Sequence, residues 1–190
     1  MIIKVISLKK ATDRRKYIRK ELVKLNLSYE FVDAIDPKYC SKNILKKFSY
    51  YKFKKLYNRF PTLGDNLAHK KFLKTKNQKS VLILEDDAKI KCSKYELLSV
   101  IKIFEKSKFD ILILGFSKCD DDYENHVNTI NPIYPIFKLK NKILIGERYL
   151  HTFSGTVGYL IKRKSAEMMS NTCSLFVLSD DWNYFSKLGL

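Results

Sequence analysis

The sequence predicts an α/β protein with one domain, residues 1–190, in which helices flank a mostly parallel central sheet. The apolar run at 81–84 lacks polar residues at alternate positions, which predicts a strand buried on both faces, as in parallel sheets. Near the amino terminus, a strand at 2–8, a helix at 12–25 and a strand at 29–32 follow one another closely. Such a unit requires parallel strands joined by a right-handed crossover.

The first helix has both a start signal and an apolar stripe. Thr12 and Asp13 suit a helix start, where a carboxylate also favours the helix dipole. Asn26 is a suitable end. The apolar residues fall on one helical face: Ala11, Ile18, Leu22 and Leu25. The helix is therefore expected to pack this face against the sheet.

The segment 41–60 is rich in lysine and aromatic residues. Its apolar residues occupy two faces at helical spacing, so one straight amphipathic helix would not present them together. Two short helices with a break near 49–52 fit better. Docking on a membrane surface and an ordinary surface subdomain both remain open for this segment.

The remaining elements follow from short apolar runs separated by polar residues. Pro61 is expected to break the chain. The region 117–131 predicts an irregular loop, and its acidic run at 120–122 is interpreted as solvated rather than metal-binding. The expected elements are helices at 64–76, 95–104 and 164–170, strands at 80–84, 110–114 and 155–161, and a hairpin of 133–138 with 143–146.

Three consecutive acids, Glu85, Asp86 and Asp87, directly follow the buried strand. Ligands of open α/β sheets bind at the carboxyl ends of the strands. One interpretation is a divalent-metal site that neutralises a phosphorylated ligand. The other is an acidic turn that caps the next helix through Asp86 or Asp87.

The charge balance narrows the class of partner. Lys and Arg number 37 against 20 Asp and Glu, a formal charge of +17, which favours nucleic acid, a phosphorylated nucleotide or an acidic membrane surface. The four cysteines are too widely spaced for a zinc site or a disulfide scaffold, so a reducing compartment is expected. Since no apolar run approaches the roughly 20 residues of a membrane span, we expect a soluble or surface-bound protein.

Several motifs occur in a characteristic order along the chain. The block LILEDDA at 82–88 is the most specific of them. The others are ISLK at 6–9 with Arg-Arg at 14–15, FVDAID at 31–36, LGDNLAH at 63–69, GTVGYLI at 155–161 and Asp-Trp at 181–182. Together they resemble the motifs of glycosyltransferase family 25, the glycosyltransferases of lipooligosaccharide biosynthesis.

Two features depart from the family pattern. The cysteine and serine that precede the family's histidine are replaced by Asp65 and Ala68. Family members usually continue further beyond the late acidic motif, so we expect a domain shortened at its carboxyl end. A catalytically weak or binding-only homologue therefore remains an alternative.

The resemblance implies a GT-A-like fold that binds a nucleotide sugar. It also implies a metal-assisted, inverting transfer, typically from UDP-galactose, to a lipooligosaccharide acceptor. Mn²⁺ or Mg²⁺ suits oxygen ligands. Glu85 and Asp87 would lie on one face if the strand persisted, and are the expected metal ligands. Asp86 would point the other way, toward a ribose hydroxyl or a backbone amide.

The remaining site residues take their expected roles from the chemistry of this transfer. Inversion needs a general base, for which Asp181 is the candidate and Asp180 its rival; capping of a helix from Trp182 onward is the alternative role. The donor-site candidates are His69, which is raised above a structural role by the family motif, Arg14 and Arg15 as a phosphate clamp, and Ser7 and Asp33 beside the uridine.

A basic nucleic-acid-binding protein, or a metal nuclease, is the rival class. Tyr and Phe number 12 each and are interleaved with lysine, which would suit base stacking. The aromatic residues fall largely on core-like positions, however, and no nucleic-acid-binding motif occurs. We therefore expect a UDP-sugar donor, a lipooligosaccharide acceptor and an anionic membrane surface as partners, no nucleic acid, and a cytoplasmic or peripheral inner-membrane location.

Overall fold

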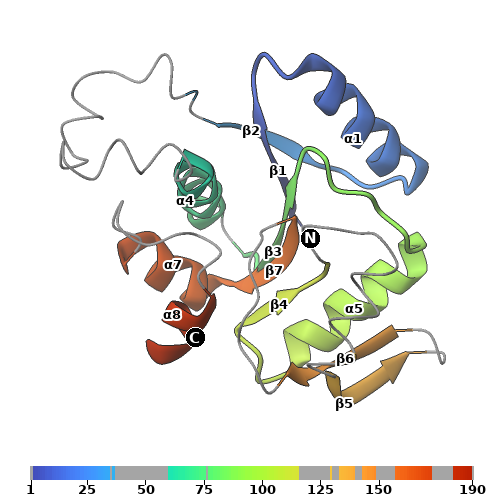
Figure 1. The fold of residues 1–190 in the computed structure, drawn as a ribbon, viewed down its shortest axis with the longest axis vertical. Coiled ribbons are helices and arrows are strands. Elements are labelled where there is room, and N and C mark those ends of the chain that lie inside the picture. The colour runs from blue at the N-terminus through green and yellow to red at the C-terminus, as the bar shows by residue number, and fades with distance from the viewer. Residues whose placement is uncertain are drawn as a thin grey trace.

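The structure is a computed structural model, shown as a ribbon in Figure 1. The helices predicted between 41 and 59, nearly all of the loop at 117–131, and the pair Asp180 and Asp181 lie outside the residues that it describes. The described residues are 2–34, 36, 60–75, 77–115, 129, 133–139, 143–148, 157–172 and 182–189.

A five-stranded sheet forms the centre, in the order β2-β1-β3-β7-β4. Strand β1 pairs in parallel with β2 on one side and with β3 on the other. Strand β7 is antiparallel to both β3 and β4, so four strands run one way and β7 runs against them. The strands are β1 (Ile2–Leu8), β2 (Glu30–Ala34), β3 (Ser80–Glu85), β4 (Ile111–Ile113) and β7 (Gly158–Lys162). The prediction of an α/β protein with a mainly parallel sheet is confirmed.

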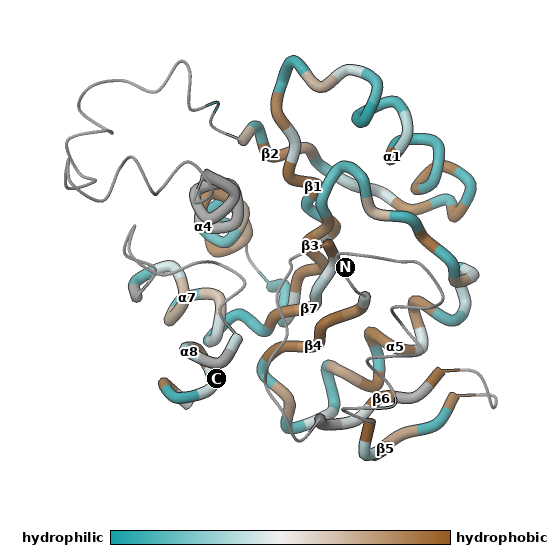
Figure 2. The backbone as a smooth tube through the Cα atoms, viewed as in Figure 1, coloured by the Kyte–Doolittle hydropathy of each residue, from teal (hydrophilic) through white to brown (hydrophobic). Residues whose placement is uncertain are grey.

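Helices cover both faces of this sheet, and each face has its own apolar core (Figure 1). Helices α1 (Thr12–Lys24) and α5 (Lys94–Lys106) pack on one face through residues such as Ile18, Leu22 and Phe104. Helices α4 (Phe60–Leu73), α7 (Arg163–Thr172) and α8 (Trp182–Lys187) cover the other. Figure 2 shows the hydrophobic residues concentrated along the central strands. Strand β3 is buried along 80–84, as the sequence predicts.

Several boundaries differ from the predictions. Helix α4 begins at Phe60, so Pro61 does not break the chain but lies in the first turn, where proline removes no helical hydrogen bond. Strand β7 begins three residues later than expected, and α7 follows it directly. The predicted hairpin is present as a separate sheet of β5 (Ile133–Leu139) and β6 (Ile143–Arg148). Within the described ranges, every helix is too short or too polar to span a bilayer.

Strand β7 also fixes the end of β3. The amide of Glu85 donates to the carbonyl of Val157 at 3.0 Å, immediately before β7 begins. Gly158 pairs with Leu84 across the two strands. A Cβ atom at Gly158 would lie only 2.9 Å from the Leu84 Cδ2 atom, so glycine allows this close approach.

Arg163 ties the end of α4 to the start of α7. Its guanidinium group donates to the carbonyls of Leu73, Thr75 and Gln78, at 3.1, 2.5 and 3.0 Å. The same group lies over the Phe72 ring, 4.7 Å from its centroid. Because helix ends leave carbonyls without intrahelical partners, this contact is expected to stabilise the fold.

His69, a residue of α4, lies in the core next to Tyr159 of β7. Its ring is fully buried, and Nε2 lies 2.9 Å from the Tyr159 hydroxyl. The Tyr159 ring in turn packs edge-on against Trp182 of α8, at a centroid separation of 5.4 Å. Burial lowers the pKa of His69 from 6.5 to about 4, so the ring is neutral at pH 7.

Replacing Arg163 with alanine is expected to lower the free energy of unfolding by about 2–3 kcal/mol, because three carbonyls lose a charged donor. Lys164→Ala, at the exposed neighbouring position, is the matched control and should change stability by less than about 0.5 kcal/mol. Urea unfolding of both variants measures this. Equal stability of the two variants would show that the Arg163 hydrogen bonds contribute nothing to stability.

The stability of the protein should fall as the pH drops from 6.5 toward 4 partly because of His69. In that range the unfolded chain binds a proton at this histidine and the folded chain does not, so acid favours unfolding. By pH 4 the loss should approach about 3 kcal/mol. His69→Gln removes this contribution, so its stability should depend less steeply on pH over the same range. Parallel pH profiles for both proteins would contradict the prediction.

Candidate functional site

The ends of three parallel strands meet at one edge of the sheet. Strand pairing places Ser7 opposite Asp33 of β2, and Ile6 opposite Glu85 of β3. The carboxyl ends of β1, β2 and β3 are therefore adjacent, and each carries polar side chains. This is the edge at which open α/β sheets bind ligands.

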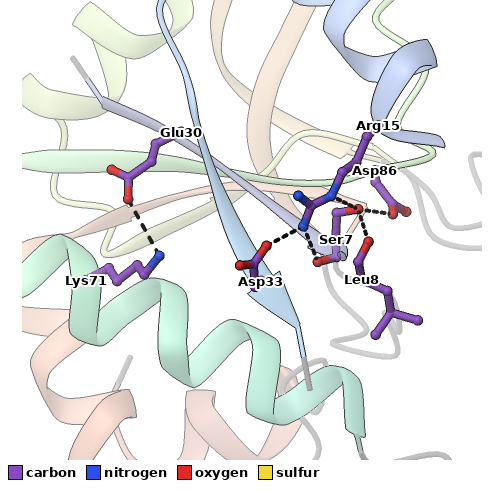
Figure 3. Close-up of polar contacts among 7 residues, drawn as sticks. All are labelled: Ser7, Leu8, Arg15, Glu30, Asp33, Lys71 and Asp86. Atoms are coloured by element: carbon purple, nitrogen blue, oxygen red, sulfur yellow. Dashed lines mark hydrogen bonds and ion pairs between the residues drawn. The ribbon is translucent and has the colours of Figure 1, made fainter. Parts of the chain in front are cut away.

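A short hydrogen bond joins the first and third of these strand ends. The Ser7 hydroxyl donates to the Asp86 carboxylate at 2.7 Å, and both side chains are buried (Figure 3). Asp86 therefore has one oxygen held by the protein itself. Such a carboxylate orients its neighbours more readily than it binds a solvent-borne ligand.

Arg15 joins the first and second strand ends. It donates to the Ser7 hydroxyl at 3.1 Å, to the Ser7 carbonyl at 3.0 Å and to the Asp33 carboxylate at 2.5 Å (Figure 3). Its guanidinium also lies 4.6 Å from the centre of the Phe31 ring. The hydrogen bond from Arg15 holds the pKa of Asp33 below its usual value. In the structure Arg15 therefore connects strand ends, and its predicted role as a phosphate clamp stays a prediction.

Arg14, in the first turn of α1, reaches the acidic cluster, which consists of Glu85, Asp86 and Asp87. One of its guanidinium nitrogens lies 3.1 Å from an Asp86 oxygen and 3.7 Å from an Asp87 oxygen. About half of the Arg14 side chain is exposed, and the Asp87 side chain is exposed to a similar degree. This contact brings the predicted phosphate-binding arginine next to the predicted metal ligand Asp87.

The acidic cluster fits a metal ion that needs only one or two protein carboxylates. Strand β3 ends at Glu85, so the strand alternation that would align Glu85 with Asp87 does not extend that far. Among the described residues, no group of three metal-ligating side chains is gathered. Mg²⁺-type ions that arrive with phosphates need only one or two carboxylates, however. The exposed carboxylate of Asp87 fits such an ion, while an all-protein cage does not fit.

The other predicted site residues lie in different surroundings. His69 is in the core, bonded to Tyr159, so its role in donor binding stays a prediction. Asp180 and Asp181 are outside the described residues. The contact of Arg14 with Asp86 and Asp87 was not predicted from the sequence. A usable signal existed, because a helix that follows β1 directly must begin beside the end of a neighbouring parallel strand.

Comparisons with known proteins place the chain in a family. One solved structure with similarity is 4-diphosphocytidyl-2C-methyl-D-erythritol synthase from Anaerococcus prevotii, at 15% identity and a TM-score of 0.36, covering 100% of this chain and 84% of that one. A TM-score this low supports no argument about function. Curated proteins give no match. The model of glycosyltransferase family 25 (LPS biosynthesis protein) matches residues 1–182. The chain therefore belongs to glycosyltransferase family 25.

Proposed function

We propose that this protein is a metal-dependent, inverting glycosyltransferase that moves a sugar, galactose in the first instance, from a UDP-sugar to a lipooligosaccharide acceptor. Its family supports sugar transfer in LPS biosynthesis. The observation that carries the finer proposal is the acidic cluster at the end of β3, joined to the ends of β1 and β2 through Ser7 and Arg15. A GT-A-like arrangement of the sheet, with the donor at this edge, is part of the proposal.

The chain's own residues divide the work of the transfer. Asp87 would hold a divalent ion, with Glu85 as the second expected ligand, and Asp86 would be kept in place by the Ser7 hydroxyl. When bound, such an ion supplies positive charge against the diphosphate leaving group. Ser7 and Asp33 would face the uridine, and His69 would support the donor site from the core. Asp181, or its rival Asp180, would take the proton from the acceptor hydroxyl.

The net charge of +17 supports a further part of the proposal, namely association with anionic bilayers that carry the acceptor lipid.

A first experiment separates the classes of function. In a thermal-shift assay, UDP with Mn²⁺ should stabilise the protein, and a single-stranded oligonucleotide should not. Stabilisation by the oligonucleotide alone would favour a nucleic-acid-binding protein. Turnover of UDP-galactose then separates a transferase from a binding-only homologue.

Asp87→Ala is expected to abolish Mn²⁺-dependent binding of UDP and to leave the fold intact, because the side chain is largely exposed at the edge of the sheet. Asp13→Ala, which removes an exposed carboxylate from the first turn of α1, is the matched control and should bind as the parent does. Isothermal titration with UDP at fixed Mn²⁺ measures both. The ligand assignment is wrong if Asp87→Ala keeps the affinity of the parent.

Asp181→Asn is expected to keep the affinity for the donor and to lose transfer by about 10²–10⁴-fold, the usual contribution of a positioned base. A role as helix cap predicts something different, since asparagine caps about as well as aspartate and transfer would be retained. Single-turnover rates and melting temperatures, with Asp180→Asn alongside, distinguish the roles. Loss of transfer only in Asp180→Asn would move the base to that residue.

A further inference from the structure

One positive group lies between two carboxylates that behave differently. The same nitrogen of Arg14 is 3.1 Å from Asp86 and 3.7 Å from Asp87. The Asp86 side chain is only 6% exposed and also accepts the Ser7 hydroxyl bond, so it is fixed in place. The Asp87 side chain is 57% exposed, and its contact with Arg14 is the longer one. Asp87 is therefore the carboxylate that can change its partner.

Arg14 is held by fewer contacts than its neighbour Arg15. It occupies the third position of α1, and its side chain is 52% exposed. The neighbouring Arg15 makes four contacts that hold the strand ends, whereas Arg14 makes ion pairs at the surface of the cluster. A long side chain in this position can swing to a new anion while its helix stays in place.

A divalent ion at Asp87 and the guanidinium of Arg14 would repel one another. Both are cations, and they would share one carboxylate at contact distance, where Coulomb interactions are strongest. A diphosphate brings new anionic oxygens to the same edge, and a guanidinium group pairs well with phosphate. The diphosphate thus offers Arg14 a second anion at the moment when Asp87 is needed by the ion.

We propose that Arg14 is a positioning residue that exchanges a carboxylate for a phosphate. Without a nucleotide it neutralises Asp87 and weakens the binding of a divalent ion there. With a nucleoside diphosphate it pairs with the phosphates and leaves Asp87 to the ion. This inference rests on the proposed function, and it predicts that the ion and the nucleotide bind cooperatively, each raising the affinity for the other by the same factor.

The test measures Mn²⁺ affinity by electron paramagnetic resonance, with and without saturating UDP, in the parent, Arg14→Gln and Lys16→Gln. Lys16 is exposed on the same helix, so its variant controls for the loss of one positive charge. Arg14→Gln should bind Mn²⁺ alone about two- to fivefold more tightly, the range for a partly exposed ion pair. The gain in Mn²⁺ affinity on adding UDP should shrink in this variant only. Arg14→Lys keeps the charge and should bind Mn²⁺ alone as weakly as the parent.

Several outcomes overturn the exchange. They are an unchanged affinity of Arg14→Gln for Mn²⁺ alone, an equal increase in Lys16→Gln, or no Mn²⁺ binding in any variant. A parent that binds Mn²⁺ but never UDP contradicts the proposed function instead, and the tighter Mn²⁺ binding of Arg14→Gln would then still support neutralisation of Asp87 by Arg14. Melting temperatures of all four proteins confirm that the comparison is made between folded chains.

Discussion

The parallel pairing of β1 with both of its neighbours is the constraint on which the candidate site depends. It puts three carboxyl ends at one edge of the sheet, and it makes α1 begin at that edge, because the helix follows β1 after a short turn. Arg14 and Arg15, near the beginning of α1, are thereby brought to the strand ends. The bond from Ser7 to Asp86 then fixes the acidic turn relative to β1.

Local charge at this edge differs from the charge of the whole chain. The protein carries an excess of positive groups, at +17, yet the strand ends hold the carboxylates of Asp33, Asp86 and Asp87 against the guanidinium groups of Arg14 and Arg15. Glu85 adds a further carboxylate at the end of β3. In the proposed function, a divalent ion would offset the repulsion between these carboxylates and an anionic diphosphate. The lysine surplus of the whole chain belongs to the proposed association with anionic bilayers, because net charge acts at longer range than these contacts.

Periodicity and composition were sufficient for most of the architecture. The unbroken apolar run at 81–84 predicted a strand buried on both faces, and the structure places this strand between β1 and β7. The direction of β7 was beyond sequence reasoning, since an apolar strand has the same pattern whichever way it runs. The beginning of α4 was missed because proline disrupts the interior of a helix but suits its first turn, where Pro61 lies. Pairings between residues far apart in the sequence, such as His69 with Tyr159, leave no periodic signal, and only packing of α4 on β7 reveals them.

Gly158 limits the ways in which this scaffold can diversify. The main chain at the end of β3 is held by the Val157 carbonyl, and any side chain at Gly158 would push against Leu84, one residue before the acids. A larger residue at position 158 would therefore displace the Leu84 side chain from the apolar core. Variation among proteins built on this framework is therefore expected in the exposed side chains around the end of β3, while the strand end itself stays in place.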